Sequence, residues 1–139
     1  TLPGDSPSPI TVGAYNHFNN SIYIHSGRGY TIGGLIKPDL AAPGVDISGP
    51  SIGFRNGGSI PMTTRTGTSV AAAHVAGAVA NLLSWGIVEG HDITMSEASI
   101  KAFLIRGAKR NPALSYPNRE WGYGALDLYE TFLRLREAR

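Results

Sequence analysis

The residues most able to do chemistry in this chain are a pair of hydroxyl side chains, Thr68 and Ser69, which follow Gly67. An apolar run of Ala, Val and Gly residues begins directly after the pair. Gly67 permits a tight turn, so we expect Ser69 in the first turn of a helix, where N–H groups are unpaired and the helix dipole is positive. A serine there can be a nucleophile whose own N–H helps to hold an oxyanion, or it can be the N-cap of the helix. The spacing alone leaves both interpretations open.

A nucleophilic serine needs a base within hydrogen-bonding distance, and His74 is the histidine nearest to Ser69 in the sequence. Five residues along a helix correspond to about 7.5 Å of rise and about 140° of rotation, so these two side chains cannot meet. We therefore predict that His74 is a buried structural residue. The other histidines, His17, His25 and His91, lie in polar or loop contexts and are expected on the surface.

Other kinds of site find little support in the sequence. The glycine-rich stretch 26–34 is not followed by the lysine motif of a phosphate-binding loop, which argues against a nucleotide-binding domain. No cluster of His, Asp or Glu has the spacing of metal ligands, and Asp39 and Asp46 show no pattern of paired carboxylates. The chain has no cysteine, so disulfides and thiolate metal sites are excluded. We predict no cofactor and no metal ligand.

The composition narrows the class of protein further. The chain has 139 residues, of which 42% are hydrophobic and 16% charged, as expected for one folded domain with a core. The net charge is +2 and the basic residues are scattered, so no nucleic-acid interface is predicted. By inspection no apolar stretch is long and uninterrupted enough to span a membrane. Residues 1–12 lack the basic and apolar segments of a signal peptide and are expected to be a loop leading into a strand.

Strands are expected early in the chain. Short apolar runs predict strands at residues 10–15 and 21–25, and a further possible strand at 45–47. The pair Asn56-Gly57 is typical of a hairpin turn.

Helices are expected late in the chain, and the strongest prediction covers residues 70–85, with Gly86 as its end. This segment is apolar on nearly every side, which predicts a helix that is buried all round. Thr94 as N-cap with Glu97 three residues later predicts the start of a second helix, with Gly107 as its stop. Asp127 is expected to cap a third. Early strands followed by helices suit part of an α/β domain.

Four segments together resemble a known family, the subtilisin-like serine peptidases or subtilases. Residues 67–77, GTSVAAAHVAG, resemble the nucleophile signature G-T-S-x-A-x-P-H-V-A-G. ITVGA at 10–14, SGRG with IKPDLAAPG at 26–44, and YPNREWGYGALD at 116–127 are similar to further family segments in the same order. Ala73 departs from the family's usual proline. This variant motif is similar to a clostridial branch that includes Csp-like spore-germination proteases and also pseudoproteases.

The resemblance implies the α/β fold of the C-terminal half of a subtilase, a mostly parallel sheet flanked by helices, with a buried central helix that starts at Ser69. It implies that Ser69 is the catalytic nucleophile, that its N–H contributes to the oxyanion hole, and that Gly67 and Thr68 form the nucleophile turn. Residues 1–139 are then an incomplete domain. The catalytic Asp and His and the oxyanion Asn are expected upstream, and the chain alone is expected to be inactive.

The implied activity is that of a serine endopeptidase, which hydrolyses peptide bonds through an acyl-enzyme on Ser69. The implied partners are a protein or peptide substrate and the upstream half of the same domain, with no nucleic acid and no membrane. The alternative is a pseudoprotease or regulatory binding protein on the same fold. Residues 1–9 and the segment before Ser69 are expected to line the substrate pocket.

Three further expectations follow. The resemblance implies an extracytoplasmic or secreted location. It also allows a structural calcium ion in the full domain, to which no residue of this chain can be assigned. Finally, an isolated half of a domain exposes a large apolar surface, which predicts a homodimer.

Overall fold

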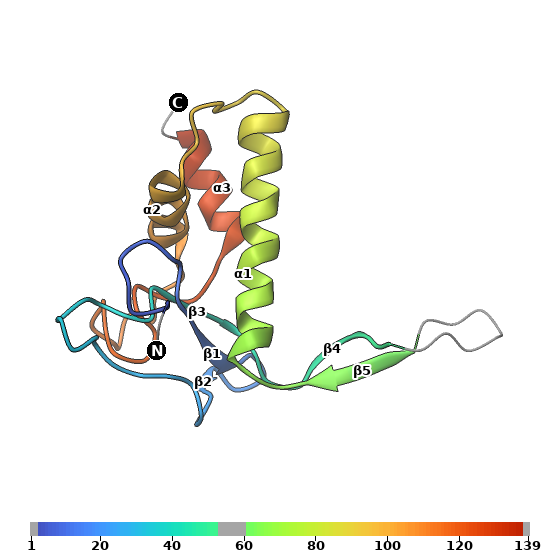
Figure 1. Ribbon diagram of the computed structural model, residues 1–139, viewed down its shortest axis with the longest axis vertical. Coiled ribbons are helices and arrows are strands. Elements are labelled where there is room, and N and C mark those ends of the chain that lie inside the picture. Colours follow the sequence, from blue (N-terminus) through green and yellow to red (C-terminus); the bar gives the residue numbers. More distant parts are fainter. Residues whose placement is uncertain (1–2, 53–60, 138–139) are drawn as a thin grey trace.

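The computed structural model describes residues 3–52 and 61–137. A small sheet at the base of this part carries the helices α1, α2 and α3 on one side, and a hairpin extends from the foot of α1 (Figure 1). The sheet has the strand order β2-β1-β3, with β1 at Val12–Asn16, β2 at Ser21–Ile22 and β3 at Leu40–Pro43. The α/β class predicted from the sequence is confirmed.

The pairing of β1 with β3 forms the centre of the sheet. These strands are parallel, with Val12 opposite Leu40 and Ala14 opposite Ala42. Ala14, Leu40 and Ala42 are fully buried, and their small or branched side chains let α1 pack closely on the sheet. The strands predicted at 10–15 and 21–25 are therefore found as β1 and a shorter β2.

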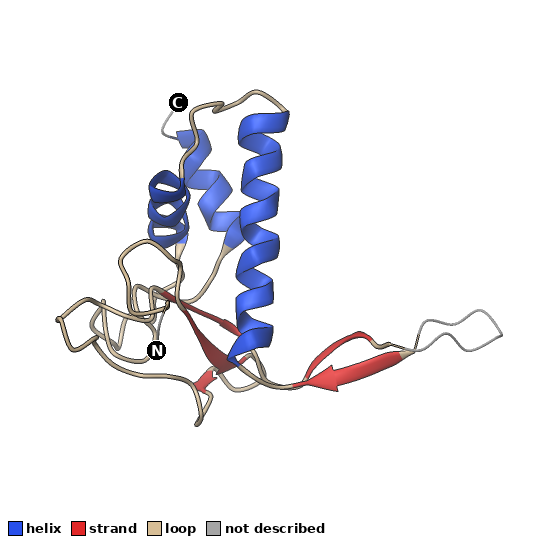
Figure 2. Cartoon of the chain, in the orientation of Figure 1, coloured by secondary structure: helices blue, strands red, loops and turns tan. Residues whose placement is uncertain are grey.

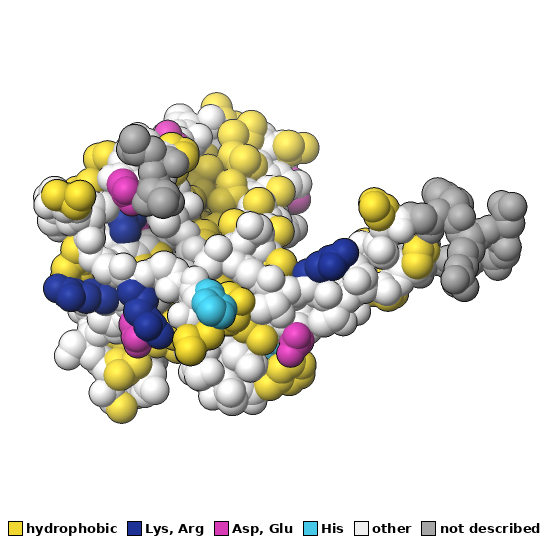
Figure 3. All heavy atoms as spheres, turned by 60° about the horizontal axis from the view of Figure 1, so that its bottom comes forward, with side chains coloured by type: hydrophobic (Ala, Val, Ile, Leu, Met, Phe, Trp, Pro, Cys, Tyr) yellow, Lys and Arg dark blue, Asp and Glu magenta, His cyan; other side chains and the backbone are white. Residues whose placement is uncertain are grey.

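A hairpin of β4 (Ile47–Pro50) and β5 (Met62–Arg65) leads from the sheet to the first turn of α1. The two strands pair antiparallel, with Ile47 opposite Arg65 and Pro50 opposite Met62. They form an arm that projects from the body of the molecule (Figure 2). Hydrophobic side chains are visible on this arm (Figure 3). The strand predicted at 45–47 is thus shifted to β4, and the predicted turn at Asn56-Gly57 lies outside the described residues.

The long helix α1 covers Thr68–Leu83 and continues as a π-helical turn, η1, at Ser84–Val88. The predicted end at Gly86 is wrong, because the helical path passes through Gly86 and it is Gly90 that adopts a positive φ of 76°. Within the described chain the helix is not buried all round, and the expected neighbours of its other faces are not among these residues. Only one stripe, four residues at helical spacing, faces the sheet and the core: Ala71, Val75, Ala78 and Leu82. Val79 and Leu83 flank this stripe and are partly buried against the same core, while most of the remaining residues of the helix are exposed.

By length and composition, residues 68–88 could cross a membrane, since the segment has 21 residues and an 18-residue window within it has a mean hydropathy of 1.5. The expectation that no stretch is long and apolar enough is therefore corrected. The core helix of a soluble domain meets the same two criteria. Here the helix packs its buried stripe against β1 and β3.

The helices α2 (Glu97–Gly107) and α3 (Leu128–Glu137) pack against each other. The predicted start of α2 is wrong by two residues. Ser96 is the N-cap, and its side chain exchanges hydrogen bonds with Ser99, whereas Thr94 bonds to Asp92. The predicted stop at Gly107 and the predicted cap at Asp127 are confirmed, the latter by a 2.9 Å bond from the Glu130 N–H to Oδ1 of Asp127.

Candidate active site

The turn before α1 is built for close approach of two backbone segments. Gly67 is the N-cap of α1 with φ 156°, and its N–H donates to the carbonyl of Gly44 over 2.7 Å. A Cβ added at Gly44 would lie 2.7 Å from Cβ of Ala14 and 2.8 Å from O of Gly67. Both glycines are thus required for the turn to sit against the end of β3, which fixes where α1 begins.

Ser69 is the second residue of α1, and it is exposed. The helix has no side-chain cap, so the alternative in which Ser69 is the N-cap is wrong. Within the described residues the structure records no hydrogen bond from the Ser69 hydroxyl. Its backbone N–H belongs to the first turn, where N–H groups have no acceptor inside the helix. A free hydroxyl and a free N–H therefore lie together at the positive end of the helix dipole.

His74 does not approach Ser69, as the helix geometry predicts. Its Nδ1 lies 3.1 Å from the carbonyl oxygen of Val70, one turn back along the same helix. The prediction that His74 is buried is wrong, because it lies beside the buried stripe on a side of α1 that nothing in the described chain covers. His17, His25 and His91 are exposed, as expected.

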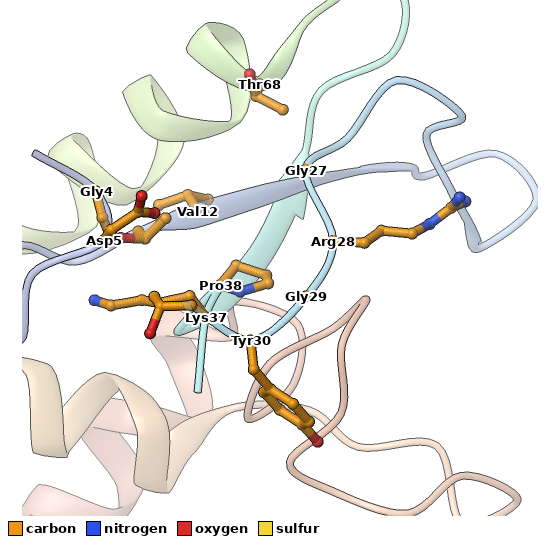
Figure 4. A pocket seen from close by; sticks show the side chains of 12 residues that line it. Gly4, Asp5, Val12, Gly27, Arg28, Gly29, Tyr30, Lys37, Pro38 and Thr68 are labelled. Atoms are coloured by element: carbon orange, nitrogen blue, oxygen red, sulfur yellow. Dashed lines mark hydrogen bonds between the residues drawn. The ribbon is translucent and has the colours of Figure 1, made fainter. Parts of the chain in front are cut away.

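A cavity of about 310 Å³ opens beside the nucleophile turn, with Thr68 in its lining. Gly4, Asp5 and Thr11 line it from the N-terminal segment, and a second group comes from the glycine-rich loop and the residues after it: Gly27, Arg28, Gly29, Tyr30, Thr31, Lys37 and Pro38. Figure 4 shows Thr68 in the first turn of α1 and, across the cavity, Tyr30 and Lys37. Thr68, the residue before Ser69, lines this cavity, whereas Ser69 itself is not among its lining residues.

The glycine-rich loop is held by a turn from the far end of the chain, residues 118–122. The N–H of Gly29 donates to the carbonyl of Arg119, and the Arg119 guanidinium lies over the Tyr30 ring at 5.2 Å. Nε of Arg28 lies 3.0 Å from Oε1 of Glu120, although both side chains are half exposed and the pair contributes little by itself. Together these contacts place one wall of the cavity.

The opposite wall is held by a buried lysine–aspartate cluster formed by Lys37, Asp39 and Lys101. Nζ of Lys37 lies 2.7 Å from Oδ2 of Asp39, and the two residues are only 7% and 5% exposed. Nζ of Lys101 lies 3.6 Å from Oδ1 of the same carboxylate. Burial lowers the pKa of Lys101, while Asp39 opposes this shift.

Sequence reasoning missed this cluster. The segment IKPDLAAPG was singled out, but its Lys37 and Asp39 were given no role. Lys101 comes from α2, far along the chain, and no local spacing connects it to them. Asp46 is separate: its Oδ1 accepts a 3.2 Å bond from the Thr66 hydroxyl. Within the described ranges no group of three or more His, Asp or Glu side chains could hold a metal ion.

Comparisons with known proteins identify the class. The model of the subtilase family, Peptidase_S8, matches residues 1–124, and the chain therefore belongs to the subtilase family. Over 136 residues the chain is 34% identical to the membrane-bound transcription factor site-1 protease of Mus musculus, which covers 94% of this chain. Over 103 residues, 74% of this chain, it is 42% identical to proprotein convertase subtilisin/kexin type 9 of the same species.

A solved structure gives a more specific likeness. The Clostridium perfringens CspB protease has a TM-score of 0.87 and 38% sequence identity, over 99% of this chain. The prenylagaramide maturation protease PagA has a TM-score of 0.72 and 27% identity over 96%. The predicted subtilase fold and the predicted similarity to a clostridial Csp protease are confirmed. The chain spans 12% of the length of the site-1 protease and 29% of the CspB chain.

Proposed function

We propose that this chain carries the nucleophile of a serine endopeptidase and that Ser69 is that nucleophile. One observation carries the proposal: the exposed Ser69 hydroxyl stands at the start of α1, unused as a cap, beside a cavity that Thr68 lines. Membership of the subtilase family supports the reaction class.

The proposed reaction is an acyl transfer through Ser69. Oγ of Ser69 attacks the carbonyl carbon of a peptide bond and transfers its proton to a histidine that lies outside this chain. The N–H of Ser69 donates to the carbonyl oxygen as it becomes negative. The histidine then protonates the leaving amine, the C–N bond breaks, and water hydrolyses the acyl-enzyme. Gly67 and Thr68 form the turn that holds the nucleophile.

The remaining partners belong to the same proposal. The catalytic His and Asp and an oxyanion Asn are provided by an upstream segment of the domain, and the substrate is a protein or peptide. Without those groups residues 1–139 do not hydrolyse peptide bonds. An extracytoplasmic location is compatible with a relative that is named as membrane-bound. A structural calcium ion remains an expectation for the whole domain.

Labelling with a fluorophosphonate, which reacts with activated serines, tests the proposal. We expect labelling of the full-length protein but not of residues 1–139 alone. Ser69→Ala should lower the labelling rate and the rate of casein cleavage by about 10⁴-fold or more. Ser96→Ala is the matched control, because Ser96 also lies at a helix start but caps it. A full-length protein that neither labels nor cleaves would instead be a pseudoprotease.

A further inference from the structure

The N-terminal wall of the cavity has an unusual support. Pro7 and Pro9 have no N–H, so this segment cannot be anchored by donating to a neighbouring strand at those positions. Its carbonyl groups are used instead. Nζ of Lys101 donates to O of Pro7 over 2.5 Å and to O of Pro9 over 3.0 Å. Nζ of Lys37 also donates to O of Pro9, over 2.9 Å.

The contacts continue from this segment to the lining of the cavity. The Thr11 N–H donates to Oδ2 of Asp39 over 2.7 Å, and the Thr11 hydroxyl donates to O of Gly4 over 2.7 Å. Gly4 and Thr11 both line the cavity, together with Lys37. An unbroken series of hydrogen bonds and ion pairs therefore runs from Lys101 on α2 to the cavity wall.

Lys101 differs from Lys37 and Asp39 in which hydrogen bonds would be lost if its side chain were removed. Without Lys101, the Asp39 carboxylate keeps Lys37 and the Thr11 N–H, and O of Pro9 keeps Lys37. Within the described residues, only O of Pro7 would lose its hydrogen-bond partner. Removal of Lys101 should therefore release the segment at Pro7, which lies between the lining residues Asp5 and Thr11, and leave the buried ion pair in place.

We infer that Lys101 is a positioning residue for substrate selection: it fixes the wall formed by residues 4–11 of the cavity beside Ser69. This inference rests on the proposed function. Lys101 touches neither the nucleophile nor the substrate. It acts on binding by holding the wall in one conformation, since a mobile wall must be ordered again each time a substrate side chain enters.

The test uses the full-length protein and two probes. The first is a small alkyl fluorophosphonate, which reports on Ser69 alone. The second is a set of peptide p-nitroanilides that differ only in the residue before the scissile bond, which reports on the cavity. We expect Lys101→Met to raise KM for the best p-nitroanilide about tenfold, as for the loss of one charge-assisted hydrogen bond, and to reduce selectivity within the set. Its kcat and its fluorophosphonate rate should stay within about twofold of the wild type.

Two further variants separate positioning from general stability. Lys101→Arg keeps a donor for O of Pro7 and should restore KM. Arg106→Met removes an exposed cation from the same helix and should leave both probes unchanged. If Lys101→Met does not fold, as judged by its thermal transition, Lys101→Gln serves for the same comparison.

The outcomes are distinct. A lower Tm with unchanged KM and selectivity in Lys101→Met would mean that the cluster only joins α2 to the N-terminal segment, and would overturn the inference alone. An equal loss of kcat and of fluorophosphonate labelling would also overturn it, because the effect would then reach the nucleophile. A wild-type protein that neither labels nor cleaves would overturn the proposed function and this inference together.

Discussion

Tyr15, at the end of β1, has a phenol whose ionisation the fold opposes. Burial raises its pKa, and the charge of Asp127 raises it further. In the unfolded chain a tyrosine loses its proton near about pH 10. Above that pH and up to the folded pKa, the folded state binds more protons, so the free energy of unfolding falls as the pH rises. Tyr15→Phe keeps the ring that packs on Trp121 at 5.2 Å and should reduce this alkaline loss.

Urea unfolding of the full-length protein between about pH 9 and pH 11 measures the effect. Tyr129→Phe is the control, because Tyr129 is 75% exposed. If Tyr15→Phe loses stability with pH as steeply as the wild type does, the buried phenol is not the cause.

Single residues also mark what the sequence could and could not predict about the site. The order of Gly67, Thr68 and Ser69 predicted a tight turn and a helix start, while the choice of Ser69 as nucleophile came from the resemblance to the subtilase signature. Of these three residues, Thr68 lines the cavity. The catalytic role of Ser69 itself stays a prediction. Lys101 could not be found, because its partners Lys37 and Asp39 are joined to it only by the tertiary fold.

Between elements, the junction of α2 with α3 depends on one glycine. Gly107 ends α2 directly against Thr131, which is 1% exposed. A Cβ at Gly107 would lie 2.6 Å from the backbone nitrogen of Thr131, so the two helices would have to separate. We expect Gly107→Ala to cost about 1–3 kcal/mol, as overpacking does elsewhere.

Thermal unfolding of the full-length protein checks this prediction as a lower Tm. Ala102→Ser, on the exposed side of the same helix, is the control and should change stability by no more than about 0.5 kcal/mol. A Gly107→Ala variant with the Tm of the control would show that α3 can shift at little cost.

The boundaries of the elements were harder to predict than their existence. Both Thr94 and Ser96 can cap a helix, and the sequence favoured Thr94 because Glu97 follows it at the capping-box distance. In the structure the Thr94 hydroxyl donates a hydrogen bond to the Asp92 carboxylate. The backbone N–H groups of Ser96 and Ser99 each donate to the hydroxyl of the other residue. Capping by Thr94 and capping by Ser96 are alternative local hydrogen-bonding patterns. The residue types alone do not show which of the two has the lower free energy.

At the scale of the whole molecule, one side of α1 has no partner within the described chain. The exposed residues of α1 and of η1, which continues it, include small and apolar side chains: Ala72, Ala73, Ala76, Ala80, Ile87 and Val88. Because an apolar surface of this kind promotes association, we expect residues 1–139 produced alone to form dimers or larger species. Size-exclusion chromatography with light scattering gives the mass directly. A single monomeric peak over a wide concentration range would contradict this prediction.

The same exposed face explains why the burial of α1 was predicted wrongly while the fold was predicted correctly. Hydrophobic periodicity reports what a helix can bury, not which neighbours are present. Ala71 and Val75 meet the sheet, whereas His74 between them is exposed, with its Nδ1 3.1 Å from the carbonyl oxygen of Val70 in the same helix. The family motifs gave the fold because they are tied to particular turns and contacts, such as Gly44 against Gly67.

The contacts of the 118–122 turn also set an order of events during translation. The Gly29 N–H donates to the carbonyl oxygen of Arg119, and the Arg119 guanidinium lies over the ring of Tyr30. A ribosome adds about 5–20 residues per second, so the glycine-rich loop emerges seconds before the turn that supports it. Until that turn has left the exit tunnel, the cavity beside Ser69 has only one of its walls in place. A nascent chain therefore acquires this pocket at the end of the synthesis of these residues, after the nucleophile itself has been made.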